Sequence, residues 1–271
     1  LPFTITRLEE TNNKNLWFVN TDTNQRYLLN SSNWETSLLP SAFNDATELS
    51  LVDNNTVSGL VNNNLIIGKF GNTQTETLLT GVLGYTIKDG LFYIASQNQT
   101  VSQIATYNWT GTALNQQLVI ISEGIPLNQS VKFYLTNQKE LFMLAGENFY
   151  RVNQNLELLN SFTRYVDFDP ANQRLSYVTP TEIYFYNFSS NRSELLARST
   201  EGLSSASVIP SFGYGFLAGP SGTEAVEIDS RGNQNRYNLF SNPSQQIFIT
   251  ANQKAVVIRS ENNLYSVLIQ K

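Results

Sequence analysis

The chain has 271 residues, of which 41% are hydrophobic and 12% aromatic, so it can bury a substantial core and is too apolar for a disordered chain. Its 17 Lys and Arg residues against 22 Asp and Glu residues leave a net charge of −5, which argues against nucleic-acid binding. It has no His and no Cys, which excludes an imidazole base, a thiolate nucleophile, disulfides and Cys/His zinc sites. We therefore expect no cofactor, no metal site and no catalytic residue, and predict that the chain is not an enzyme.

Short strands separated by polar turns run along the whole chain, and amphipathic helical periodicity is almost absent. The strongest predicted strands recur at intervals of 34 to 50 residues. They begin at Leu16, Val57, Leu91, Leu141, Leu175, Gly215 and Ala255. This is the spacing of β-propeller blades, in which four strands use about 40 residues.

Each of these strands is followed, after a polar turn, by a second strand, so that seven hairpins are predicted. The second strands begin at Gln25, Leu65, Ile104, Phe149, Ile183, Ala225 and Leu264. A further β-prone stretch precedes each hairpin, and a fourth strand follows each one except the last. The pattern predicts an all-β fold, a single β-propeller domain over residues 1–271 with seven blades at approximately 1–40, 45–83, 84–123, 130–160, 161–199, 203–240 and 244–271.

The absent fourth strand of the last unit leaves the closure of the propeller open. Propellers usually complete the last blade with a strand from the other end of the chain, and residues 1–8 are the only candidate. If these residues serve that purpose, the first unit loses a strand and the blade count changes. Six blades are the alternative.

Two segments resemble the repeat of TolB-type, WD40-like bacterial propellers. They are DFDPANQRLSYV at residues 167–178, followed by EIYFYN, and ITANQKAVVIR at residues 249–259, followed by NNLYSVLI. The resemblance covers two blades, and residues 172–173 and Gln253 replace the glycine of the family's turn. It implies a non-enzymatic, extracytoplasmic protein of the cell envelope that holds a protein partner.

Asp167 and Asp169 flank Phe168 and are the first candidates for a chemical site. A spacing of two in a strand directs both carboxylates to one face, where they could bind a cation. The alternative, which we favour, is that Asp169 caps the turn at Pro170 and Asp167 is solvated.

Other candidate groups have ordinary explanations. Six acidic residues occupy predicted connections, where a propeller glycosidase would carry paired carboxylates, but no spacing pairs them, and we interpret them as surface charges. They are Glu9, Glu10, Asp45, Glu123, Glu147 and Glu201. Trp17, Trp34, Trp109 and the aromatic run at residues 184–186 could stack on a sugar, but we expect core packing, with Trp109 the most exposed. The glycine-rich residues 211–222 lead into a strand, not a helix, and we interpret them as a strand and turn.

The sequence identifies no ligand-binding residue. We predict a scaffold or protein-interaction module of a bacterial envelope or surface protein. One alternative is a carbohydrate-binding or carbohydrate-active propeller, and another is a structural subunit that assembles through its incomplete last blade. No apolar run approaches the roughly 20 residues that span a bilayer. Any targeting segment or anchor is expected upstream of Leu1.

Overall fold

The computed structural model describes residues 5–10, 16–20, 23, 25–29, 35–97, 102–121, 129–169, 174–209, 213–228, 234–250 and 254–269. Within these residues the chain forms seven antiparallel sheets in sequence order, six of four strands and one of three. The prediction of an all-β fold with seven blades is confirmed, and the six-bladed alternative is wrong. The chain divides into two compact units, Pro2–Leu158 and Leu159–Lys271, which we call the N-terminal and C-terminal units.

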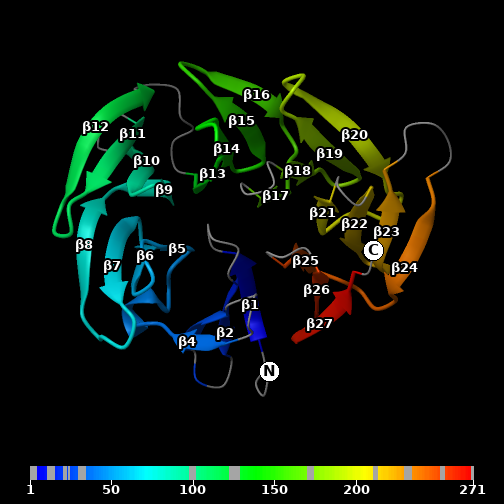
Figure 1. Ribbon diagram of the computed structural model, residues 1–271, viewed down its shortest axis with the longest axis horizontal. Coiled ribbons are helices and arrows are strands. Elements are labelled where there is room, and N and C mark those ends of the chain that lie inside the picture. Colours follow the sequence, from blue (N-terminus) through cyan, green and yellow to red (C-terminus); the bar gives the residue numbers. More distant parts are fainter. Residues whose placement is uncertain are drawn as a thin grey trace. The chain divides into compact units, whose positions relative to one another are not determined.

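The N-terminal unit contains four sheets, coloured blue to green in Figure 1. The first sheet contains β1 (Ile5–Glu10), β2 (Leu16–Asn20), β3 (Gln25–Leu29) and β4 (Thr36–Leu38), and is followed by a 3₁₀ helix, η1 (Ser41–Phe43). The second sheet contains β5 (Glu48–Leu51), β6 (Thr56–Val61), β7 (Asn64–Lys69) and β8 (Thr75–Thr80). The third contains β9 (Val82–Lys88), β10 (Leu91–Gln97), β11 (Ser102–Trp109) and β12 (Leu114–Ile121). The fourth contains β13 (Val131–Leu135), β14 (Leu141–Ala145), β15 (Asn148–Val152) and β16 (Leu156–Asn160), and the division into units falls within β16.

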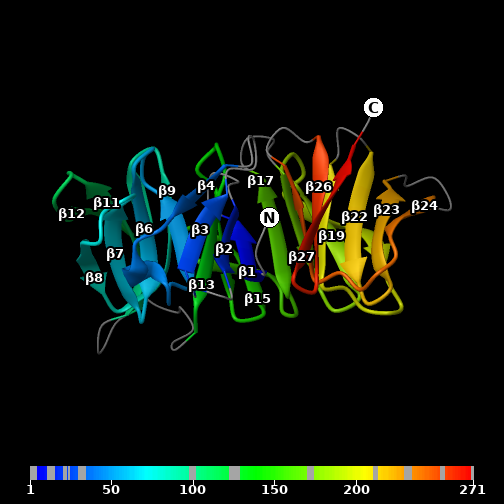
Figure 2. The same cartoon turned by 90° about the horizontal axis from the view of Figure 1, so that it is seen from below.

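The C-terminal unit contains the other three sheets, whose strands run side by side in Figure 2. The fifth sheet contains β17 (Tyr165–Asp169), β18 (Arg174–Val178), β19 (Glu182–Asn187) and β20 (Arg192–Arg198). The sixth contains β21 (Ser205–Ile209), β22 (Tyr214–Gly219), β23 (Gly222–Glu227) and β24 (Arg236–Phe240). The seventh contains β25 (Gln246–Ile249), β26 (Ala255–Ser260) and β27 (Asn263–Leu268).

The seventh sheet lacks a fourth strand among the described residues, as the sequence predicts. The candidate for completing it was the segment of residues 1–8. Its residues from Ile5 onward belong to β1, which pairs with β2 of the first sheet. Residues 1–4 lie outside the described residues.

Tight turns explain why consecutive strands pair. β6 and β7 are joined by Asn62 and Asn63, which both have positive φ values, 49° and 61°. β9 and β10 are joined by Asp89 and Gly90, with φ values of 51° and 76°. Two successive residues with positive φ form the type I′ turn, whose twist matches that of an antiparallel hairpin, and Asn, Asp and Gly tolerate this backbone best. These turns fix the register of the hairpins.

The core lies between facing sheets of the same unit. In the N-terminal unit, for example, Tyr93 and Ile104 of the third sheet pack with Phe133 and Met143 of the fourth. In the C-terminal unit, Val178 of the fifth sheet packs in one cluster with Val208 of the sixth. The second strand of a sheet is often buried on both faces, as in β14 and β18, where every residue is buried. A single sheet therefore cannot remove its own apolar surface from water.

The third and fourth sheets approach closely enough to require a glycine. A Cβ atom built on Gly84 of β9 would lie 1.7 Å from the carbonyl oxygen of Val131 in β13. At the other end of β9, Lys88 Nζ donates to the carbonyl of Thr136 at 2.5 Å and to Asn137 Oδ1 at 2.7 Å. Partial burial lowers the pKa of Lys88, and the two acceptors compensate for the lost hydration. The contact is thus tight at one end of β9 and polar at the other.

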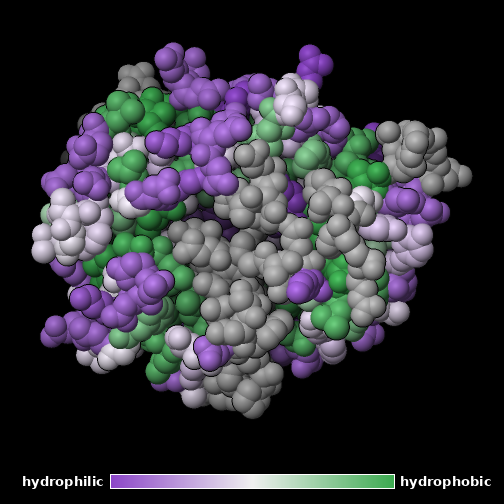
Figure 3. Space-filling view, in the orientation of Figure 1, coloured by the Kyte–Doolittle hydropathy of each residue, from purple (hydrophilic) through white to green (hydrophobic). Residues whose placement is uncertain are grey.

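The surface mixes polar and apolar residues. On the face shown in Figure 3, hydrophilic and hydrophobic residues alternate across the described part of the chain. None of the helical structure in the described residues is long and apolar enough to cross a membrane.

We predict that Gly84→Ala destabilises the protein. The added methyl group would overlap the backbone of Val131, and relieving that overlap should cost about 1–3 kcal/mol. Urea denaturation followed by tryptophan fluorescence measures the loss. Gly215→Ala is the matched control, because the nearest atoms to its Cβ position lie at 4.0 Å, and it should leave the midpoint almost unchanged. Equal midpoints for the two variants would contradict the close approach.

Candidate protein-interaction surface

The fifth sheet has one packed face and one exposed face at its outer strands. Ile183 of β19 and Ala197 of β20 are paired and belong to the core shared with the sixth sheet. Since neighbouring residues of a strand point to opposite faces, Glu182, Tyr184 and Arg198 lie on the face turned away from the sixth sheet. Glu182 is paired with Arg198 and Tyr184 with Leu195, which places Leu195 on this face as well. We call these four residues the Arg198 surface.

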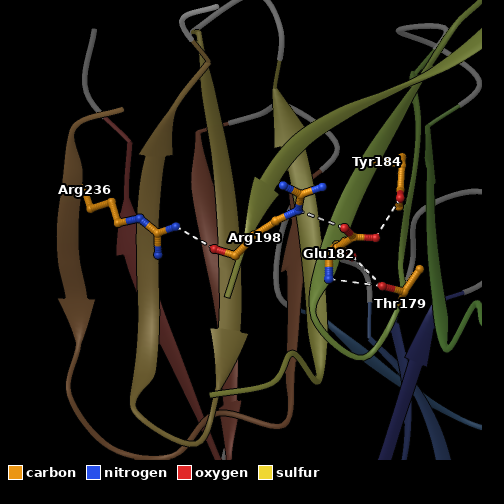
Figure 4. A network of polar contacts seen from close by, with 5 residues as sticks. All are labelled: Thr179, Glu182, Tyr184, Arg198 and Arg236. Atoms are coloured by element: carbon orange, nitrogen blue, oxygen red, sulfur yellow. Dashed lines mark hydrogen bonds and ion pairs between the residues drawn. The ribbon is translucent and has the colours of Figure 1, made fainter. Parts of the chain in front are cut away.

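Glu182 holds Arg198 in place (Figure 4). Arg198 Nε lies 2.9 Å from Glu182 Oε1, and the Tyr184 hydroxyl donates to Glu182 Oε2 at 2.7 Å. The backbone N–H of Glu182 donates to Thr179 Oγ1 at 3.1 Å. In Figure 4 the two Nη atoms of Arg198 point away from Glu182. The guanidinium is therefore anchored through one donor and presents the others outward.

The same contacts set the protonation states. The hydrogen bond from Tyr184, followed by that from Arg198, lowers the pKa of Glu182 below its ordinary value. The hydrogen bond to Glu182 is the main cause that raises the pKa of Tyr184 to about 12, with burial second. Glu182 thus stays ionised and Tyr184 stays neutral across the physiological range, so the anchor of Arg198 does not change with moderate changes in pH.

Two side chains of the sixth sheet fix the backbone of β20 from the other side. Arg236 Nη2 donates to the carbonyl of Arg198 at 2.8 Å, and Gln234 Nε2 donates to the carbonyl of Leu196 at 2.5 Å. Arg236 is itself held by Glu224 at 3.2 Å. The outer strand that carries Arg198 is therefore held from both sides.

The Arg198 surface is accessible. The side chain of Arg198 is 73% exposed and Leu195 is 41% exposed. Arg and Tyr are the residue types most enriched among the energetically dominant residues of protein interfaces, and a side chain already held in one conformation loses less entropy on binding. Two of the four residues of the Arg198 surface, Arg198 and Tyr184, therefore belong to types that are common at the centre of protein interfaces.

Of these four residues, the sequence singled out only Tyr184, as part of the aromatic run at residues 184–186. Glu182 and Tyr184 lie two residues apart in the predicted strand EIYFYN, and this spacing indicates that their side chains share one face of the sheet. Their pairing with Arg198 was not detectable, because it depends on a register shift between β19 and β20. That shift brings residue 198 opposite residue 182.

Asp167 is neither solvated nor a cation ligand. Its side chain is 1% exposed and forms an ion pair of 3.1 Å with Arg174 Nη2, whose side chain is 2% exposed. Ser207 Oγ in β21 also donates to the carboxylate. The expectation that Asp167 is solvated is therefore wrong, because Arg174, the first residue of β18, neutralises its carboxylate inside the sheet. The side chain of Asp169 lies outside the described residues.

The other candidates are dispersed. Asp45, Glu147 and Glu201 are exposed and lie in connections before β5, between β14 and β15, and before β21. Glu123 and the side chains of Glu9 and Glu10 lie outside the described residues. No group of three or more acidic residues that could hold a metal ion occurs among the residues described.

The aromatic candidates lie mainly against apolar neighbours. Trp109, expected to be the most exposed tryptophan, is half-buried and packs against the core shared by the second and third sheets. Tyr186 is fully buried, and Tyr184 stacks on Tyr177 with ring centroids 5.1 Å apart. Trp34 and the side chain of Trp17 lie outside the described residues. Residues 214–219 and 222–227 form β22 and β23, as the glycine-rich stretch predicts.

Comparison with known proteins supports the fold. No family model matches the sequence, and no curated protein is similar to it. Solved structures do match: the WD40 β-propeller domain of Doa1 is 12% identical, with a TM-score of 0.57, over 100% of this chain and 96% of that chain. The chain therefore has a WD40-like β-propeller fold.

A second match is the extracellular domain of a hybrid two-component system from B. thetaiotaomicron, with a TM-score of 0.64 and 12% identity. It covers 97% of this chain, while this chain spans only 38% of that one. At this identity the match demonstrates a shared fold.

A third match corrects the sequence-based exclusion of catalysis. Streptogramin B lyase is 12% identical, with a TM-score of 0.62, over 98% of this chain and 94% of that chain. An enzyme thus has the same fold over almost its whole length. This match contradicts the prediction that the chain is not an enzyme, because it shows that the same propeller fold occurs in an enzyme.

We predict that Arg174→Met destabilises the protein by about 3–5 kcal/mol, because it leaves the buried carboxylate of Asp167 without its cation. Chemical denaturation gives the change in unfolding free energy. The double variant Asp167→Val with Arg174→Met should be more stable than the single variant, since no buried charge is left. A single variant as stable as the wild type would contradict the ion pair.

We predict that Glu182→Gln lowers the pKa of Tyr184 from about 12 toward its ordinary value, because the anionic acceptor of its hydroxyl is removed. Titration of ¹³C-labelled tyrosine by NMR measures this pKa, with Tyr184→Phe identifying the signal. Tyr93, whose pKa is raised mainly by burial, serves as an internal control and should not shift. An unchanged Tyr184 titration would show that the hydrogen bond to Glu182 does not set its pKa.

Proposed function

We propose that this chain is a protein-interaction module that acts outside the cytoplasm and binds its partner through the Arg198 surface. The observation that carries this proposal is the exposed guanidinium of Arg198, held by Glu182 on one side of β20 while Arg236 holds the strand from the other. An exposed arginine is usually mobile, and fixing it in one position is useful mainly for recognition.

The chemistry of the surface indicates what the partner presents. The Nη donors of Arg198 can form a bidentate pair with a carboxylate, and Leu195 on the same face offers an apolar contact beside it. We therefore expect an acidic residue flanked by an apolar one on the partner. Electrostatic attraction of this kind favours fast association and a defined orientation.

The location outside the cytoplasm rests on two observations. One is the fold shared with an extracellular domain, and the other is the resemblance of residues 167–178 and 249–259 to the repeat of TolB-type envelope propellers. The same proposal has three further parts: the chain belongs to that bacterial group, it is located in the cell envelope, and residues 1–271 form one domain.

We predict that a photo-crosslinking residue, p-benzoylphenylalanine, in place of Leu195 forms one discrete adduct with a partner protein in cells that express the chain. Leu118→p-benzoylphenylalanine is the matched control, because Leu118 is 62% exposed on β12 of the third sheet and belongs to the other compact unit. The adduct is detected by gel mobility and identified by mass spectrometry.

Charge reversal then tests the role of Arg198. Adding Arg198→Glu should reduce the adduct at least tenfold, whereas Arg192→Glu, at the exposed opposite end of β20, should leave it unchanged. Adducts of equal yield from both leucine positions, or equal effects of the two charge reversals, would contradict the proposal.

A further inference from the structure

The last strand of the seventh sheet, β27, occupies the third position, which in the other six sheets belongs to an interior strand. In the other six sheets the third strand pairs with a fourth, but β27, the third strand of the seventh sheet, pairs only with β26 among the described residues. Its residues are correspondingly more exposed: none is buried, whereas the central residues of β7 are all buried. Within the described part of the chain, β27 is therefore the edge strand of its sheet.

The register of the hairpin identifies the groups at this edge. Ile269 donates its N–H to the carbonyl of Lys254 at 2.8 Å, so residues of the same parity in β27 bond inward to β26. In an antiparallel ladder the intervening residues direct their N–H and C=O groups to the opposite side. The outward groups thus belong to Leu264, Ser266 and Leu268.

The edge strands of the other sheets carry features that hinder pairing with another strand, namely charged side chains, bulges or short length. β8 contains Glu76, β16 contains Glu157, β20 contains Arg192, Glu194 and Arg198, β24 contains Arg236, β12 has two register shifts against β11, and β4 has three residues. β27 has none of these features. It is uncharged, contains no proline, and pairs with β26 over six residues without a register shift.

The sequence of β27 is complementary to itself. Leu264-Tyr265-Ser266-Val267-Leu268 is nearly palindromic about Ser266. If two copies pair antiparallel with a two-fold axis at Ser266, each Leu264 faces a Leu268, each Tyr265 faces a Val267, and the two Ser266 residues face each other. Aliphatic, aromatic–β-branched and hydroxyl pairs are all favourable across strands, and no like charges meet.

This register also matches the backbone. Leu264, Ser266 and Leu268 all direct their peptide groups outward, so each can exchange both hydrogen bonds with its counterpart across the axis. Any other register that keeps the outward groups opposed shortens the overlap. On one face Tyr265 is already fixed by Phe240, with ring centroids 4.6 Å apart, and Leu268 on the other face is 71% exposed.

We propose that two copies of this chain associate through β27, forming a continuous antiparallel sheet across a two-fold axis at Ser266. Such an interface is isologous and closes on itself, so it gives a dimer and not a filament. Because one strand pair is a small interface, the dimer dissociates on dilution. The proposal does not depend on the Arg198 surface.

Sedimentation velocity over a wide concentration range tests the dimer. The wild-type chain should shift from monomer to dimer as its concentration rises. Ser266→Lys and Ser266→Glu should each be monomeric over the same range, because they bring like charges together on the axis. An equimolar mixture of the two variants should regain the dimer, since the charges across the axis are then opposite.

The controls separate this interface from others. Ser37→Lys introduces the same charge at an exposed residue of β4 and should leave the dimer intact, as should Arg198→Glu. Unchanged thermal melting shows that the Ser266 variants are folded. Three results would each overturn the proposal: a wild-type chain that stays monomeric, a dimer that survives Ser266→Lys, or a variant mixture that stays monomeric. In the first case β27 does not pair with a second copy, and a strand of another protein becomes the candidate partner.

Discussion

The burial of the inner strands on both faces is the constraint on which the rest of this structure depends. Strands such as β14 and β18 are buried at every residue, so a sheet cannot remove its apolar surface from water by itself. The close approach of the third and fourth sheets then requires a glycine at position 84. Exposed residues are correspondingly frequent in the fourth strands, such as β8, β12 and β24.

Polar groups caught between sheets are satisfied by specific partners. Lys88 bonds a carbonyl of the next sheet, Arg236 bonds a carbonyl of the preceding one, and Asp167 receives both Arg174 and Ser207. Asp167 is buried, and its charge would be costly without such partners. A similar ion pair forms at the surface, between Glu182 and Arg198.

The architecture could be predicted from sequence because it depends on local patterns. Alternating apolar residues mark the strands, Asn and Asp-Gly mark the turns, and the spacing of the hairpins marks the blades. The pattern also predicts that the last sheet has three strands, as it does in the described residues. The Arg198 surface depends on a register shift, and the burial of Asp167 depends on Ser207, forty residues away in another sheet. The absence of His and Cys excludes particular catalytic groups, whereas the fold itself is shared with an enzyme and does not exclude catalysis.

The strict sequence order of the sheets has a kinetic consequence. Every sheet is built from strands that follow one another along the chain, so most pairings close short loops, for which little chain entropy is lost. Folding can then begin in any hairpin and spread to the sheets beside it, as in other repeat proteins. During synthesis, the early sheets can form before the later ones have left the ribosome. Long-range contacts such as that between Tyr165 and Ile247 are then made late, between parts that are already ordered.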